Sequence, residues 1–156
     1  MMDFPERLQD NKPLILDGAM GTELAHRGFP IQLPLWSAQS VLEHPDAVLK
    51  IHEDYIAAGA DILTTCTFRT DTRTFHKAGF NSTNAKKATF QAVDLVKQSI
   101  RNSKPNRKVW IAGSMSPLED CYRPDLALDQ ITAFHEHYEK AGWLCEAGVD
   151  LSSSKR

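Results

Sequence analysis

The sequence has no long hydrophobic segment and no targeting pattern at its start. Its uninterrupted apolar stretches are a handful of residues long, whereas a helix that crosses a bilayer needs roughly 18. Residues 1–12 mix Asp3, Glu6, Arg7 and Asp10 among few apolar residues, unlike the apolar core and cleavage site of a signal peptide. These absences predict a protein that is neither secreted nor embedded in a membrane.

Cysteine is scarce, and neither sign of charge dominates. The 3 cysteines, Cys66, Cys121 and Cys145, are odd in number and widely spaced, which fits neither a disulfide framework nor the paired spacing of a structural zinc site. This pattern predicts a reducing, cytoplasmic compartment. The 18 Lys and Arg against 20 Asp and Glu give a formal charge of −2 without a long run of like charge, which argues against a nucleic-acid partner.

What is present is the composition of one globular domain. The chain has 156 residues, of which 42% are hydrophobic and 24% charged, with 8 Gly and 8 Pro. These proportions exclude collagen-like and disordered compositions. A chain of this length can bury roughly 70% of its unfolded surface, so a substantial core is possible.

Hydrophobic periodicity predicts alternating strands and helices. We expect a buried strand at residues 13–16, further strands at 60–68 and 108–113, and the start of a fourth at 149–151. We expect helices at 45–58 and 83–101, and a third that begins after an N-cap at Asp125 and ends at Gly148. The buried stripe of this third helix is predicted to be Ala127, Ile131, Phe134, Tyr138, Ala141 and Cys145.

This alternation predicts an α/β protein with parallel strands joined by right-handed crossovers. Two architectures share the pattern: an open doubly wound sheet, and a (β/α)8 barrel of about 250 residues. The length favours the open sheet. The repeat, however, stops in the opening residues of a strand and gives way to a polar stretch at 152–156, which indicates an interrupted repeat and argues against a complete open sheet.

In both architectures ligands bind where the strands end, and three polar segments follow predicted strands. In residues 17–24, Asp17 precedes two glycines that allow close backbone approach to a ligand, although the same pattern fits a tight turn with a capping aspartate. Residues 64–67 offer three hydroxyls and a thiol, which fit either a polar ligand site or ordinary strand and core positions. Residues 113–117 fit a plain loop and gain interest only beside the other two.

The histidines do not form a metal-binding pattern. His135 and His137 are two residues apart on a predicted helix, so they point to nearly opposite sides, whereas a chelating pair needs three or four residues of separation. We therefore interpret both as helix-surface residues. His52 lies at the edge of the apolar stripe of its helix, which predicts a partly buried, hydrogen-bonded histidine.

Six ordered blocks of sequence carry a resemblance to a known family. They are residues 17–24, 34–38, 52–61, 65–68, 112–114 and 146–150. In this order they resemble the N-terminal half of the homocysteine S-methyltransferase family. The resemblance divides the chain into an N-terminal segment at 1–12, part of a homocysteine-binding domain at 13–151, and a polar tail outside the family pattern at 152–156.

The resemblance implies a (β/α)8 barrel, of which this chain has about the first three and a half βα units. It implies an enzyme of methionine biosynthesis that transfers a methyl group from S-methylmethionine, S-adenosylmethionine or a similar donor to homocysteine. In that family zinc, held by three cysteine thiolates, binds the homocysteine sulfur and makes a thiolate available. The residues that the resemblance assigns to the substrate are Asp17, Gly18, Thr65, Cys66, Thr67 and Ser114.

The family's zinc cysteines lie in later strands, and none of the three cysteines here matches them. We therefore expect a homocysteine S-methyltransferase half that has no metal site and is inactive alone, with homocysteine and a methyl donor as the family's substrates. One alternative is a non-catalytic half-barrel that forms a homodimer through its open edge and binds a small amino acid. Another is a complete open-sheet domain that binds a phosphate-bearing ligand near Gly18 and Gly21.

Overall fold

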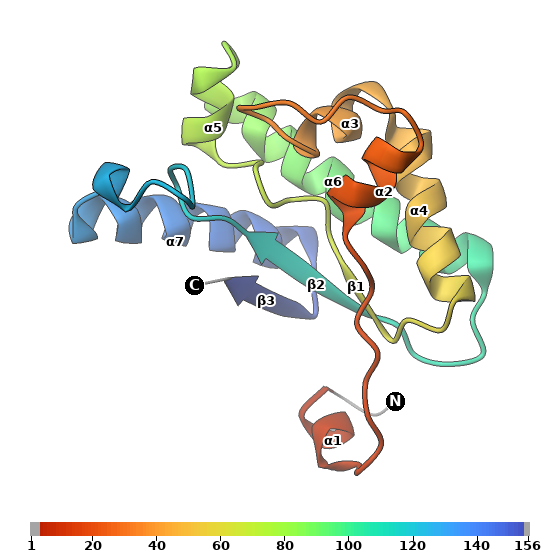
Figure 1. The fold of residues 1–156 in the computed structure, drawn as a ribbon. Helices are drawn as coiled ribbons and strands as arrows, with labels where there is room; N and C mark the ends of the chain where they lie inside the picture. The colour runs from red at the N-terminus through yellow and green to blue at the C-terminus, as the bar shows by residue number, and fades with distance from the viewer. Residues whose placement is uncertain (1–3, 155–156) are drawn as a thin grey trace.

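A computed structural model describes residues 4–154 and shows three parallel strands covered by helices (Figure 1). The strands β1 (Ile62–Thr64), β2 (Trp110–Met115) and β3 (Leu151–Ser154) lie in the order β1-β2-β3, with Leu63 opposite Ile111 and Ala112 opposite Leu151. The helices are α1 (Phe4–Gln9), α2 (Met20–His26), α3 (Ala38–Glu43), α4 (Pro45–Ala57), α5 (Thr72–Lys77), α6 (Ser82–Ser103), the 3-10 turn η1 (Pro124–Leu126) and α7 (Gln130–Ala147).

The crossover helices pack on one face of the sheet. Leu63, Ile111 and Met115 point to this face, where α4 and α6 cover the first two and α6 and α7 cover the third. The chain passes from β1 to β2 through α5 and α6, and from β2 to β3 through α7. The predicted α/β class with parallel strands is therefore confirmed, because each parallel pair needs such a crossover.

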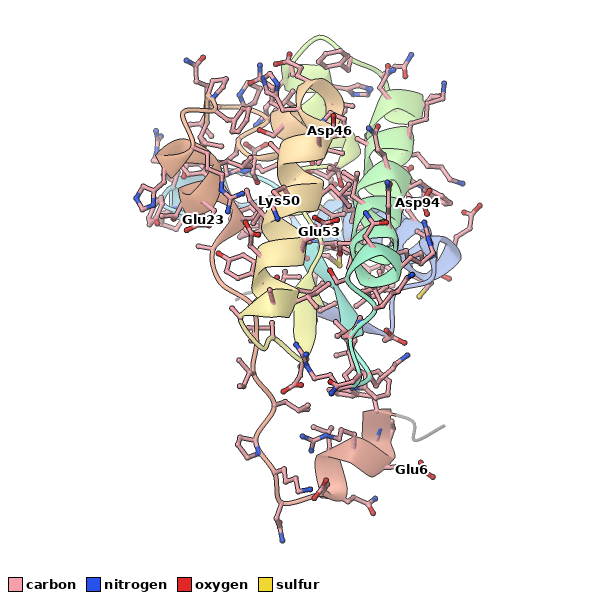
Figure 2. The ribbon with its side chains drawn as sticks, turned by 90° about the vertical axis from the view of Figure 1, so that its right-hand side faces the viewer. Glu6, Glu23, Asp46, Lys50, Glu53 and Asp94 are labelled. Carbon is pink, nitrogen blue, oxygen red and sulfur yellow. The ribbon has the colours of Figure 1, made fainter. Side chains whose placement is uncertain are left out.

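The two helices predicted at 45–58 and 83–101 are confirmed as α4 and α6. The buried face of α6 is built from small residues such as Ala85, Ala88 and Ala92, which let neighbouring helices approach closely. Figure 2 shows α4 and α6 side by side, with Asp46 and Lys50 of α4 and Asp94 of α6 labelled. No helix among the described residues combines the length and apolarity that a bilayer crossing needs.

The first predicted strand is present only as a single bridge between Leu16 and Ile62. The segment still runs alongside β1, because the Asp17 amide donates to the Ile62 carbonyl and the Ile62 amide donates to the Ile15 carbonyl. The prediction that it is buried is wrong: Ile15 is 54% and Leu16 59% exposed. The segment lies at the sheet edge, where no other described strand pairs with it.

The remaining strand boundaries shift by a few residues. β1 is shorter than the predicted 60–68. Beyond Thr64 the backbone pairing with β2 is replaced by side-chain contacts, in which the Thr67 hydroxyl bonds to the amide and carbonyl of Ser114. β2 begins and ends two residues later than predicted. β3 includes residues 152–154, which the sequence pattern placed in a polar tail, since their backbone pairs with residues 113–115 of β2.

The last helix differs most from expectation. Its N-cap is Asp129, which accepts hydrogen bonds from the Ile131 and Thr132 amides, whereas Asp125 lies in η1. The predicted stripe faces outward instead of inward. The most exposed members of this stripe are Ile131 at 71%, Phe134 at 63% and Tyr138 at 72%. The helix packs through another face of its C-terminal half, whose buried members are Lys140, Trp143, Leu144 and Ala147.

His52 is fully buried in α4, and neither of its ring nitrogens has a hydrogen-bond partner. The expected hydrogen bond is thus absent, because the surrounding side chains of the α4 core are mostly apolar. Burial disfavours the charged imidazolium and lowers the pKa of His52 from 6.5 to about 4.

The buried imidazole predicts acid sensitivity. Between pH 6.5 and 4 the unfolded chain binds a proton that folded His52 does not, so the free energy of unfolding should fall by about 3 kcal/mol across this window. Urea unfolding measured at several pH values should show a weaker pH dependence for His52→Leu. His135→Leu, at an exposed position, should behave as wild type. Equal pH dependence in wild type and His52→Leu would contradict the assignment.

Candidate functional site

The carboxyl ends of the parallel strands bring three distant segments to one edge of the sheet (Figure 1). These are the turn after residue 16, the loop after β1 and the loop after β2. In α/β folds ligands bind at this edge. The residues predicted to contact a substrate therefore lie at the end of the sheet where a ligand is expected.

Asp17 is fixed against the end of β1. Its carboxylate accepts hydrogen bonds from the Thr64 amide at 2.7 Å and from the Thr64 hydroxyl at 2.8 Å. The aspartate does not cap the following helix, because the N-cap of α2 is Ala19, without a side-chain cap bond. The carboxylate therefore joins the first turn to β1 and lies half-buried at the strand ends.

Gly18 is required by the close approach of Tyr55 from α4. A Cβ atom at Gly18 would lie 2.6 Å from the Tyr55 hydroxyl oxygen, which is too near for any side chain without a shift. Burial raises the pKa of Tyr55, with the charges of Glu23 and Asp17 acting in the same direction. The Tyr55 phenol, which lies beside the Asp17 turn, is therefore uncharged at physiological pH.

Thr65, Thr67 and Ser114 form one buried hydrogen-bond network. The two threonine hydroxyl oxygens are 2.7 Å apart, and the Thr67 hydroxyl donates to the Ser114 carbonyl at 2.8 Å. The Ser114 amide points back at the Thr65 and Thr67 hydroxyls, at 3.2 and 3.1 Å. The structure therefore brings these three predicted residues together. The two threonine hydroxyls bond to the Ser114 backbone and fix the loop after β1 against the end of β2.

Cys66 points away from this network and into the core. Its thiol is 3% exposed, packs with Leu24, Val41 and other apolar residues, and donates to the Ser37 carbonyl at 3.4 Å. Burial raises the pKa of the Cys66 thiol to about 11, so it is a protonated thiol at neutral pH.

Sequence patterns do not predict the buried cation that lies beside these loops. Lys140 of α7 is 3% exposed and donates to the hydroxyls of Thr70, in the loop after β1, and Thr89, on α6. The periodicity of α7 placed the buried face elsewhere, and a lone lysine carries no signal that distinguishes a buried position from a solvated one.

The cysteines and histidines of the described chain do not fit a metal ion. No group of three or more His, Cys, Asp or Glu side chains in residues 4–154 converges on one point. Cys66 is a protonated core thiol, and Cys121 and Cys145 are exposed and free. Zinc requires deprotonated thiolates arranged around one centre, which these positions do not provide.

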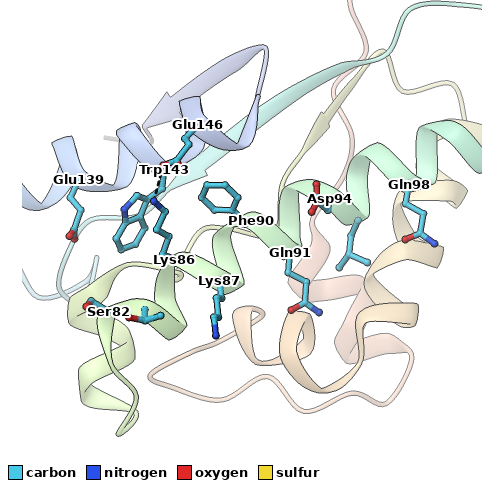
Figure 3. A pocket seen from close by; sticks show the side chains of 12 residues that line it. Ser82, Lys86, Lys87, Phe90, Gln91, Asp94, Gln98, Glu139, Trp143 and Glu146 are labelled. Carbon is cyan, nitrogen blue, oxygen red and sulfur yellow. Dashed lines mark hydrogen bonds and ion pairs between the residues drawn. The ribbon is translucent and has the colours of Figure 1, made fainter.

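A large open pocket lies away from the strand ends. It measures about 930 Å³ and lies between α6 and α7, where Phe90 and Trp143 line it (Figure 3). Lys86 spans its edge through an ion pair to Glu146 at 2.8 Å. None of the predicted substrate residues lines this pocket. We therefore assign the candidate site to the buried hydrogen bonds at the strand ends, and not to this surface groove between helices.

Comparisons with known proteins give a consistent result. The sequence model of the family described as homocysteine S-methyltransferase matches residues 14–154, a range that includes residues 152–154. Homocysteine S-methyltransferase YbgG from Bacillus subtilis is 34% identical over 162 residues, covering 94% of this chain and 51% of that protein. The homocysteine S-methyltransferase of Escherichia coli is 31% identical, covering 88% of this chain and 48% of that protein.

Solved structures agree with the sequence matches. The homocysteine methyltransferase MmuM from Escherichia coli, in its metallated form, superimposes with a TM-score of 0.84 and 28% identity, covering 96% of this chain and 56% of that one. Its oxidized form gives a TM-score of 0.81. The chain spans about half the length of the curated relatives it matches. Because the family's sequence model matches nearly all of it, the chain belongs to the homocysteine S-methyltransferase family.

Proposed function

We propose that this chain is the homocysteine-binding N-terminal half of a homocysteine S-methyltransferase, folded as the first part of a (β/α)8 barrel. The observation that carries the proposal is the meeting of the Asp17 turn and the network of Thr65, Thr67 and Ser114 at the carboxyl ends of adjacent parallel strands. The family match and the free edges of the sheet among the described residues support the barrel.

Asp17 is the proposed partner for the ammonium group of homocysteine. The two bonds from Thr64 hold the orientation of this carboxylate, and a carboxylate is the side-chain acceptor suited to an ammonium group. Gly18 is proposed to contribute its backbone, and its lack of a side chain lets Tyr55 pack against this turn. A charge-assisted bond in this half-buried position gives both affinity and orientation.

Thr65 and Thr67 are proposed to act on the amino acid through the backbone that they hold in place. Their hydroxyls are bonded to each other and to Ser114, so they fix the peptide groups at the ends of β1 and β2. The family resemblance assigns Cys66 to the substrate. Because its thiol lies in the core, we propose that Cys66 supports the site by packing.

The proposed reaction of the whole enzyme is transfer of a methyl group from S-methylmethionine, S-adenosylmethionine or a similar sulfonium donor. The homocysteine sulfur forms a bond to the methyl carbon while the bond from that carbon to the donor sulfur breaks, giving methionine and a neutral thioether. This step needs a thiolate. The described residues do not fit a metal and include no activated cysteine, so we expect the chain alone to bind homocysteine without turnover.

Homocysteine binding tests the proposal. We expect calorimetry to detect binding of L-homocysteine to the wild type, and Asp17→Asn to weaken it about tenfold or more by removing a charged acceptor. Asp94→Asn, which removes a carboxylate from the exposed side of α6, should bind as wild type. A folded wild type that does not bind homocysteine, or an Asp17→Asn variant with unchanged affinity, would contradict the proposal. Binding of inorganic phosphate instead would favour the open-sheet alternative.

A second candidate function is an assembly module that forms a homodimer. The observations in its favour are the exposed apolar stripe of Ile131, Phe134 and Tyr138 on α7 and the outer edge of β3, which no other described strand pairs with. Exposed apolar side chains in a row and a free strand edge both favour association with another surface.

Light scattering tests the homodimer. We expect the wild type to have twice the mass of one chain, and Phe134→Asp to shift it toward the monomer because the carboxylate would be buried without a partner. His135→Asp changes an exposed neighbour outside the stripe and should leave the mass unchanged. A stable, cooperative wild-type monomer at high concentration would contradict dimer formation.

A further inference from the structure

Lys140 is a buried cation whose hydrogen-bond partners are neutral. Its side chain is 3% exposed, and its ammonium group donates to the Thr89 hydroxyl at 3.0 Å and to the Thr70 hydroxyl. No ion pair to a carboxylate is found for it among the described residues. A buried charge without a carboxylate in direct contact is costly, so its position requires an explanation.

The threonines that accept hydrogen bonds from Lys140 connect it to the loop after β1, which carries the proposed substrate residues Thr65 and Thr67. The Thr70 hydroxyl lies 2.7 Å from the Thr89 hydroxyl and 3.2 Å from the Thr67 carbonyl, to which it can donate. Thr67 in turn donates to the Ser114 carbonyl. Lys140 is therefore connected through Thr70 to the residue that joins the ends of β1 and β2.

The protonation of Lys140 sets the direction of these hydrogen bonds. An ammonium group is a donor only, so a hydroxyl that accepts from it must direct its own proton elsewhere. Because the Thr70 and Thr89 hydroxyl oxygens are 2.7 Å apart, one of the two hydroxyls must donate to the other. When Thr89 donates to Thr70, the Thr70 proton points to the Thr67 carbonyl. A neutral amine could accept the Thr70 proton instead, which would release the Thr67 carbonyl.

We propose that Lys140 is a positioning residue for homocysteine binding, which fixes the loop after β1 through Thr70 so that Thr67 holds the Ser114 backbone at the strand ends. The assignment rests on the proposed function. In this assignment Lys140 does not contact the ligand. The loop after β1 depends on Lys140, whereas the rest of the fold does not.

The surroundings of Lys140 place its titration near neutral pH. Burial lowers its pKa to about 7, while the negative charge of Asp71 and the thiol of Cys66 act in the opposite direction. Asp71 comes from the loop before α5 and Cys66 from the loop after β1, and α6 faces the lysine with the Thr89 hydroxyl. Homocysteine affinity should therefore weaken as the pH rises from 6 to 8.

Hydrogen exchange separates this role from a purely structural one. In Lys140→Met, which keeps the length and apolar body of the side chain, we expect amide exchange in residues 65–71 to rise about tenfold while α4 stays protected. Thr70→Val should reproduce the effect because it cuts the same link. Thr89→Val removes the bond from Lys140 to α6 and the Thr89 contacts to the Thr70 hydroxyl and carbonyl, but it leaves the bond from Thr70 to the Thr67 carbonyl, so its effect should be smaller. Lys97→Met is the matched control, since this half-buried lysine donates to the Ala147 carbonyl at the C-terminal end of α7.

Homocysteine calorimetry on the same full-length variants completes the test. Lys140→Met should bind several-fold more weakly than wild type at pH 6 and should lose the pH dependence between 6 and 8, whereas Lys97→Met should keep both. Unchanged exchange in residues 65–71, or a pH dependence that persists in Lys140→Met, would overturn the assignment of Lys140 while leaving homocysteine binding intact. A folded wild type without any homocysteine binding would overturn the proposed function and this assignment with it.

Discussion

The parallel pairing of β1, β2 and β3 is the constraint on which the rest of the structure depends. Parallel strands cannot be joined by tight turns, so α6 and α7 must cross over and pack on the sheet. The buried face of α6 then packs on Leu63 and Ile111, and that of α7 packs on Met115. The same pairing places all strand carboxyl ends at one edge, which is why Asp17 and Ser114 come near the same loop although they are far apart in sequence.

Hydroxyl groups, rather than charges, hold this edge together. Thr65, Thr67, Thr70 and Thr89 are buried and bonded to one another or to backbone carbonyls. Each hydroxyl both donates and accepts, so a chain of them can satisfy buried peptide groups on neighbouring loops. Lys140 adds a group that only donates, which gives the chain a direction. A network of this kind is rigid when every member is satisfied and sensitive to the loss of one member.

The covered face of the described sheet differs from the exposed parts of the fold. The face shared by α4, α6 and the sheet is closely packed, whereas Ile15 and Leu16 at one sheet edge and the outer stripe of α7 remain exposed. The chain spans about half the length of the curated relatives it matches.

Local sequence by itself determined the fold class, the helices α4 and α6, and the end of α7 at Gly148, because apolar spacing and helix-ending residues act over short range. It also placed Asp17, Thr65, Thr67 and Ser114 at strand ends. Only the tertiary structure decided which face of α7 is buried, because a stripe such as Ile131 and Phe134 is covered only if a neighbouring element lies against it. For the same reason, packing of distant elements put Cys66 in the core, left His52 without a partner and brought Lys140 to Thr70.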